Sequence, residues 1–143
     1  MIKELVYITY QTFPAETANS IQTISNIKYF VKNEVNVDLY FPLRERQSDG
    51  DINKLKSYYS FSENFNSIGV KHPYPHGKIK FFPGLWFHIS HFLWSKKVVG
   101  KLSKNYGNDI HFITRSDWIA FFLAKKNRKV VFECHQTSKL RNL

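Results

Sequence analysis

The chain has 143 residues, of which 43% are hydrophobic and 17% aromatic, and its formal net charge is +10. This length fits one domain with a sizeable core, and the apolar content excludes a disordered chain. The single cysteine, Cys134, excludes an internal disulfide and a cysteine zinc cluster, and no apolar run is long enough to span a bilayer. These features indicate a cytoplasmic protein.

Apolar patterning predicts strands and helices in alternation. Residues 4–9 form a near-continuous apolar run, as in a strand covered on both faces. A helix is expected from Asn19 or Ser20, either a competent N-cap, to Lys32. The later elements are a strand at 35–41, a short helix capped by Asp51, a weak strand at 67–71, a helix at 85–104, a strand at 109–114, a helix capped by Ser116 and a strand at 129–134.

This order, βαβαβαβαβ with short connections, predicts an α/β fold. We expect a Rossmann-like three-layer domain, in which a parallel sheet of about five or more strands is flanked by helices. Residues 1–143 are expected to form this single domain.

Positive charge is unevenly distributed along the chain. No acidic residue lies between Glu63 and Asp109, and a second basic cluster flanks residues 129–134. One-sided charge favours an anionic partner, namely a phospholipid surface, a phosphorylated substrate or a nucleic acid. The alternative is that the lysines only solvate the surface.

Polar residues collect where the predicted strands end, which is where parallel sheets bind ligands. His135 directly follows the strand at 129–134 and is a candidate acid, base or hydrogen-bond donor, or else a structural histidine. Glu133 either orients it or faces a helix lysine. Arg115 is expected to bind phosphate or carboxylate, or to pair with Asp117 or another carboxylate.

The sequence contains no familiar nucleotide-binding motif and no complete set of metal ligands. Neither a dinucleotide fingerprint nor a P-loop is present. Only His88 and His91 have helical spacing among the nearby histidines, and no carboxylate accompanies them, so no metal site is expected.

The helix at 85–104 carries two apolar stripes and several lysines, which is more apolar surface than packing on a sheet requires. Aromatic and cationic residues together suit a membrane interface. The alternative is that the second stripe packs under another helix or another domain. The candidate membrane contacts are Lys78, Lys80, Trp86, Trp94, Lys97 and Lys101.

Three segments resemble the N-terminal domain of GT-B-fold glycosyltransferases of the family 4-like group: residues 8–22, 109–116 with their Thr-Arg step, and 129–138 with Glu-x-His. The resemblance implies an acceptor-binding domain, with His135 as the catalytic residue near the transferred sugar. It also implies a substrate-binding role for six residues: Thr12, Thr17, Asn19, Arg115, Thr137 and Ser138. The Gly-Gly step that this family often has in its first loop is missing here.

The implied activity is retaining, metal-independent transfer of a hexose from a nucleotide-sugar to a sugar or lipid-linked acceptor, in glycan or cell-envelope polysaccharide or glycolipid synthesis. The donor would bind in a C-terminal domain with a Glu-x7-Glu motif that this chain lacks, so the domain is expected to need no cofactor and to be inactive alone. Members often work at the inner face of the cytoplasmic membrane. The alternative function is a stand-alone basic module for an anionic partner such as phospholipid or nucleic acid, although no nucleic-acid motif is present.

Overall fold

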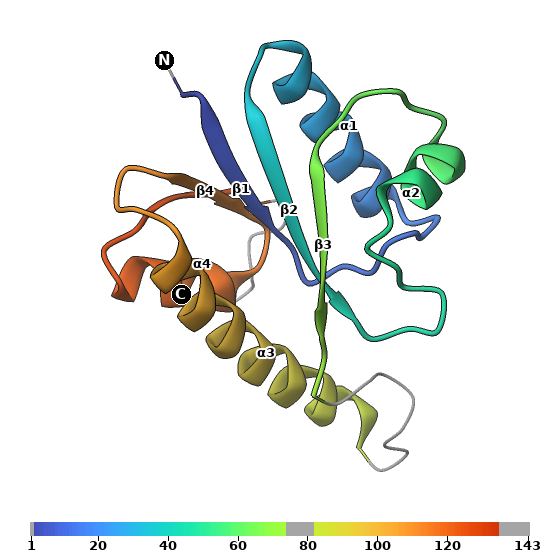
Figure 1. The fold of residues 1–143 in the computed structure, drawn as a ribbon. Coiled ribbons are helices and arrows are strands. Elements are labelled where there is room, and N and C mark those ends of the chain that lie inside the picture. Colours follow the sequence, from blue (N-terminus) through green and yellow to red (C-terminus); the bar gives the residue numbers. More distant parts are fainter. Residues whose placement is uncertain (1, 74–81, 135–143) are drawn as a thin grey trace.

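The computed structural model describes residues 2–73 and 82–134 of the chain, and in this part five parallel strands alternate with four helices. The strands pair in the order β3-β2-β1-β4-β5 (Figure 1). The predicted α/β Rossmann-like fold is therefore confirmed. Its elements are β1 (Glu4–Ile8), α1 (Ala18–Lys32), β2 (Asn36–Leu43), α2 (Ile52–Tyr59), β3 (Asn66–Lys71), α3 (Pro83–Asn105), β4 (His111–Thr114), α4 (Asp117–Lys125) and β5 (Lys129–Phe132).

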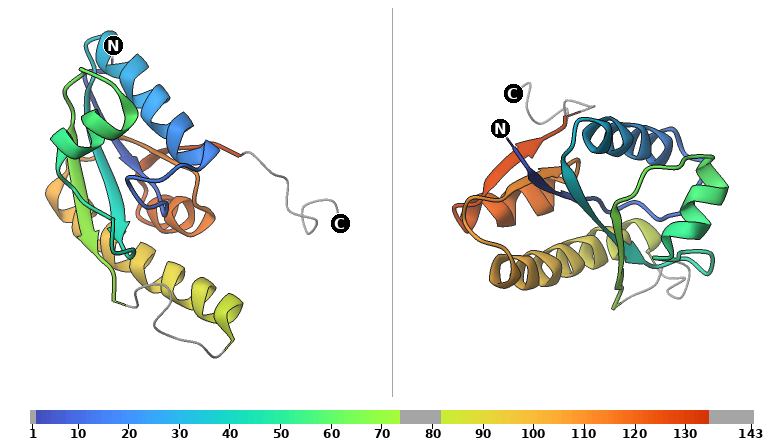
Figure 2. Two further views of the ribbon diagram at one scale, coloured as in Figure 1. Left: turned by 90° about the vertical axis from the view of Figure 1, so that its right-hand side faces the viewer. Right: turned by 45° about the horizontal axis from the view of Figure 1, so that its top comes forward.

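The sheet is covered on both faces, with α1 and α2 on one side and α3 and α4 on the other (Figure 2). Successive side chains of a strand point to opposite faces, and β1 fills both layers in this way. Leu5 and Tyr7 belong to the core under α1 and α2, whereas Val6 and Ile8 belong to the core under α3 and α4. The continuous apolar run of β1 is thus explained by burial on both faces.

Local cap chemistry sets where the helices begin. The predicted caps of α2 and α4 are confirmed, because Asp51 accepts a hydrogen bond from Asn53 N and Ser116 accepts one from Ile119 N. The predicted cap of α1 at Asn19 or Ser20 is wrong. Thr17 is the N-cap, since its extended backbone lets Oγ1 accept from Ser20 N at 3.2 Å.

Both apolar stripes of α3 are used inside the domain. Trp94 has no exposed surface and its Nε1 donates to the Val70 carbonyl at 3.4 Å, so the expectation that it contacts a membrane is wrong. On the neighbouring face, Phe92 packs edge-on against Trp118 and Phe122 of α4. The sheet covers one stripe and α4 covers much of the other. Of the two alternatives given by the sequence for the second stripe, packing under another helix is therefore the one observed.

Candidate functional site

The connections of β1 and β4 diverge at the centre of the sheet. These strands are hydrogen-bonded neighbours, yet the chain continues from β1 toward β2 on one side and from β4 toward β5 on the other. This is a topological switch point, and ligands of open α/β sheets bind beyond the carboxyl ends of the strands there. Ile8 and Thr114 are paired at those ends, so the segments that follow them lie side by side.

Two cavities lie at this point and share a wall. The smaller has a volume of about 220 Å³ and the larger a volume of about 610 Å³. Phe87, His91, Arg115 and Ser116 line both of them. Thr9, Tyr10, Gln11 and Arg44 complete the smaller cavity, and His88, Asp117, Trp118 and Phe121 complete the larger cleft. Side chains from both sides of the switch point and from α3 therefore form one continuous site.

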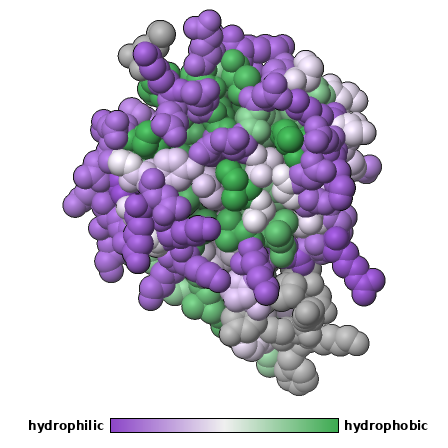
Figure 3. Space-filling model, viewed as in Figure 1, coloured by the Kyte–Doolittle hydropathy of each residue, from purple (hydrophilic) through white to green (hydrophobic). Residues whose placement is uncertain are grey.

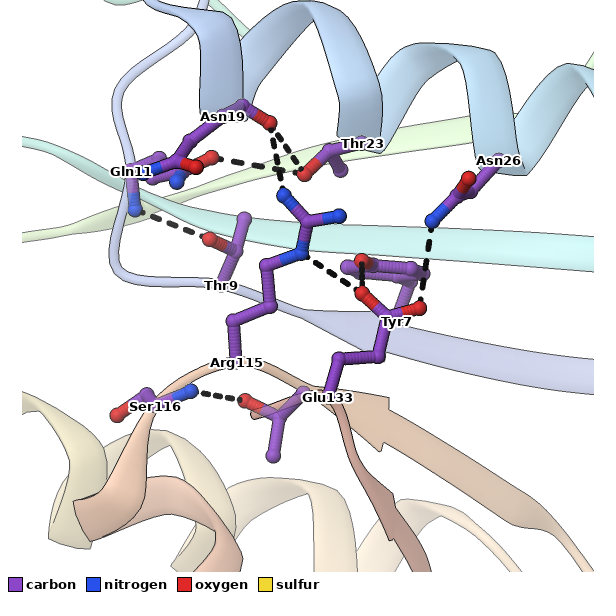
Figure 4. Close-up of polar contacts among 10 residues, drawn as sticks. Tyr7, Thr9, Gln11, Asn19, Thr23, Asn26, Arg115, Ser116 and Glu133 are labelled. Atoms are coloured by element: carbon purple, nitrogen blue, oxygen red, sulfur yellow. Dashed lines mark hydrogen bonds and ion pairs between the residues drawn. The ribbon is translucent and has the colours of Figure 1, made fainter. Parts of the chain in front are cut away.

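Arg115 connects three elements beneath this site. Its Nε donates to Glu133 Oε2 at 2.7 Å and its Nη1 donates to the Asn19 carbonyl at 3.2 Å (Figure 4). Only 7% of the Arg115 side chain is exposed. Of the sequence alternatives, pairing with a carboxylate is therefore the one observed, and the partner is Glu133. One guanidinium donor, Nη2, is buried with no hydrogen-bond partner among the described residues.

Glu133 is the carboxylate on which these contacts converge. Besides Arg115, it accepts from the Tyr7 hydroxyl at 2.8 Å and from Asn26 Nδ2 at 3.2 Å (Figure 4). Burial, together with the adjacent carboxylate, raises the pKa of Tyr7 to about 12, so the phenol stays protonated and donates. The alternative in which Glu133 faces a helix lysine is not what the structure shows.

Arg44 immediately follows β2 and enters the smaller cavity. Its guanidinium carbon lies 4.7 Å from the centre of the Tyr10 ring and 5.5 Å from that of Phe87. Such stacking leaves the in-plane donors available. Two of them, Nε and Nη1, are buried and have no hydrogen-bond partner in the described part of the chain. Sequence reasoning missed this residue, although a charged side chain directly after a buried strand was a usable signal.

His91 lies between the two cavities as a neutral ring. It stacks on Tyr10 with ring centres 3.8 Å apart and hydrogen-bonds Ser116 Oγ at 2.7 Å. Burial, assisted by the positive charge of Arg44, lowers the pKa of His91 to about 3. Tyr10 is held in turn by His72 Nε2 at 2.8 Å. His91 is therefore a fixed part of the wall and does not exchange protons near neutral pH.

The other sequence candidates fall into three groups. Thr12, Thr17 and Asn19 do not line these two cavities; Thr17 caps α1 and Asn19 offers its carbonyl to Arg115. Lys97 and Lys101 are exposed on α3, and Trp86 is half-buried. The remaining candidates lie outside the described residues, namely Lys78, Lys80, His135, Thr137 and Ser138.

Residues 2–73 and 82–134 offer neither a metal-ligand cluster nor a membrane-spanning helix. No three histidine, cysteine or acidic side chains are grouped closely enough to hold a metal ion there, and no helix in those ranges is both long and apolar enough to cross a membrane. On the face seen in Figure 3, hydrophilic side chains cover most of the surface, with apolar ones between them.

No family model, curated protein or solved structure matches this chain. The fold and the cavities define an α/β domain with a two-part cleft at the switch point of its sheet.

Proposed function

We propose that this chain is the acceptor-binding domain of a retaining, nucleotide-sugar-dependent glycosyltransferase of glycan or cell-envelope synthesis. The observation that carries the proposal is the aromatic-walled cleft at the switch point, with Arg115 of the Thr-Arg step in its lining. The nucleotide-sugar would bind in a separate C-terminal domain, which would close over the carboxyl ends of β1 and β4.

The larger cleft has the chemistry to hold a sugar. Phe87, Trp118 and Phe121 supply apolar faces for the C–H side of a pyranose ring, and a few polar groups beside them fix its orientation. Ser116 and Asp117 are such groups at the start of α4. Because His91 is held neutral, acid or base chemistry is not assigned to it. The resemblance assigns that role to His135.

In the enzyme that contains this domain, Phe87→Ala is expected to raise the KM for the acceptor by about tenfold, because truncating a cleft aromatic removes roughly 1–3 kcal/mol of packing. His135→Ala is expected to abolish transfer with the fold intact. The measurement is transfer of label from a panel of nucleotide-sugars to sugar and polyprenyl-linked acceptors, with circular dichroism as the check on folding.

Tyr29→Ala is the matched aromatic control, because Tyr29 is 66% exposed on α1 and lies outside the cleft. Its kinetics should equal those of the wild type. Absence of transfer with every donor, or full turnover in His135→Ala, would contradict the proposal.

Peripheral attachment to the inner face of the cytoplasmic membrane forms part of the same proposal. It rests on the exposed lysines of α3, among them Lys97 and Lys101. Each lysine near an anionic surface contributes about 1 kcal/mol of binding. Replacing both by Gln should therefore weaken co-sedimentation with phosphatidylserine vesicles by about tenfold or more.

The control for net charge is Lys32→Gln with Lys54→Gln, in α1 and α2 on the opposite helix layer. This pair removes the same charge and should leave vesicle binding unchanged. Equal sedimentation with neutral and anionic vesicles, unaffected by salt, would refute membrane attachment. If the chain instead binds a random oligonucleotide in a salt-sensitive way, the alternative function is favoured, a stand-alone basic module for an anionic partner.

A further inference from the structure

The smaller cavity contains unpaired buried donors from two arginines. Arg44 Nε and Nη1 and Arg115 Nη2 have no hydrogen-bond partner among the described residues, and both side chains line the cavity. A buried donor left unsatisfied is destabilising, and more so when the group is charged. Proteins rarely retain such a cost without a use for the site. Two arginines with such donors, both in the lining of one cavity, favour a ligand that accepts hydrogen bonds.

Charge in this cavity is one-sided. Among the described residues, its lining contains two guanidinium groups and no carboxylate. Glu133 contacts Arg115 through Nε, and the carboxylate is also held by Tyr7 and Asn26. Asp117 lines only the larger cleft. His91, which also lines the cavity, adds no charge, because burial holds its pKa far below neutrality. The positive charge of the described lining therefore favours an anion over a neutral acceptor.

The volumes of the two cavities indicate which part of a ligand each one can hold. A whole small-molecule pocket usually measures about 300–1,000 Å³. At about 220 Å³ the smaller cavity is below that range, and the adjoining cleft of about 610 Å³ is within it. An anionic group thus fits the smaller cavity, while the rest of the molecule extends past Phe87 toward Trp118.

We propose that Arg44 and Arg115 together bind the anionic group of the ligand, a phosphate ester or a carboxylate, whose ring lies in the adjoining aromatic cleft. Arginine is suited to this because its planar guanidinium donates to two oxygens of one anion. That the ligand is a glycosyl acceptor, and hence an anionic sugar, rests on the function proposed above. The anion site itself does not depend on that function.

The test is an equilibrium titration of this chain, followed by calorimetry and by the ¹⁵N-resolved Nε–H NMR signals of its arginines. The probes are inorganic phosphate, glucose 1-phosphate, glucuronate and methyl glucoside. An anionic sugar is expected to bind about tenfold or more tightly than methyl glucoside and to shift the Arg44 Nε–H signal. Whether glucose 1-phosphate or glucuronate binds better identifies the anion as phosphate or carboxylate.

Arg44→Met should reduce anion binding by about tenfold or more, without loss of the fold, because Arg44 makes no ion pair in the described chain. Arg46→Met is the matched control, since Arg46 is exposed two residues further on. Arg115→Lys is the second variant and keeps the charge beside Glu133. Arg115→Lys should weaken anion binding. A cooperative thermal transition of this variant would show that it is still folded.

Three results would overturn the site: an unshifted Arg44 signal at millimolar anion, equal binding of methyl glucoside, or equal losses in Arg44→Met and Arg46→Met. Because binding here needs no donor sugar, the result is independent of transfer. Anion binding in an enzyme that transfers no sugar would reject the function and keep the site. If the enzyme transfers sugar to neutral acceptors and Arg44→Met leaves that transfer unchanged, the proposed function stands and the anion site is rejected.

Discussion

Glu133→Ala is expected to lower the free energy of unfolding by about 3 kcal/mol, because it leaves the Arg115 guanidinium buried without its carboxylate. The pair is separated by 2.7 Å, and the exposed fractions of the two side chains are 7% for Arg115 and 23% for Glu133. The same substitution removes the acceptor of the Tyr7 hydroxyl. Denaturant unfolding, analysed for the free energy in water, measures the loss.

The control is Glu63→Ala, which also breaks an ion pair, with Lys32 at 3.3 Å. Lys32 is 66% exposed, so water replaces the lost carboxylate and the effect should be much smaller. The double variant Arg115→Met with Glu133→Leu should be more stable than Glu133→Ala, since it leaves no buried charge. Wild-type stability in Glu133→Ala would show that neither the ion pair with Arg115 nor the contacts of Glu133 with Tyr7 and Asn26 stabilise the fold.

Acidification is expected to destabilise the domain through His91. The pKa of this histidine is about 3 in the folded chain, chiefly through burial, whereas an unfolded histidine has a pKa of about 6.5. Between pH 3 and pH 6.5, His91 is protonated in the unfolded chain but stays neutral in the folded chain. Stability is therefore complete above pH 6.5 and declines as the pH falls toward 3, by about 2 kcal/mol between pH 6.5 and 4.5.

Denaturant unfolding at a series of pH values tests this dependence. His91→Phe keeps a ring against Tyr10 and should flatten the decline between pH 6.5 and 4.5. The groups that act on His91 are Arg44 after β2, His72 after β3 and His88 on α3. His88→Phe, at an exposed position of the same helix, should retain the wild-type decline. An unchanged slope in His91→Phe would assign the acid sensitivity to other groups.

Much of the fold could be predicted because its determinants are local. The apolar run of β1, the alternation of β2 and the caps at Asp51 and Ser116 each act within a few residues. The cap of α1 could not be chosen locally, since Thr17, Asn19 and Ser20 are all competent caps. The structure uses Thr17 there, while the Asn19 carbonyl is occupied by Arg115, 96 residues away.

The candidate site was predictable only in part. Arg115 was found because it ends a central strand, and strand ends in parallel sheets face the ligand. Arg44 was missed although its place directly after a buried strand was a local signal. His91 was missed because its role depends on α3 packing against Tyr10, which no local pattern records. Trp94 was misassigned for a related reason: periodicity reveals an apolar stripe but not which layer covers it.

The position of Glu133 behind Arg115 also determines which ionic form of a ligand the smaller cavity can neutralise. Among the described residues, two guanidinium groups and one carboxylate carry a net charge of +1, and the neutral His91 ring adds nothing. If the cavity binds an anion as proposed, a monoanion matches that charge, whereas a doubly ionised phosphate exceeds it by one negative charge. If the proposed anion site is occupied, Glu133 affects the ligand's charge state through its contact with Arg115, and Glu133→Gln should shift the preference of the cavity toward dianions.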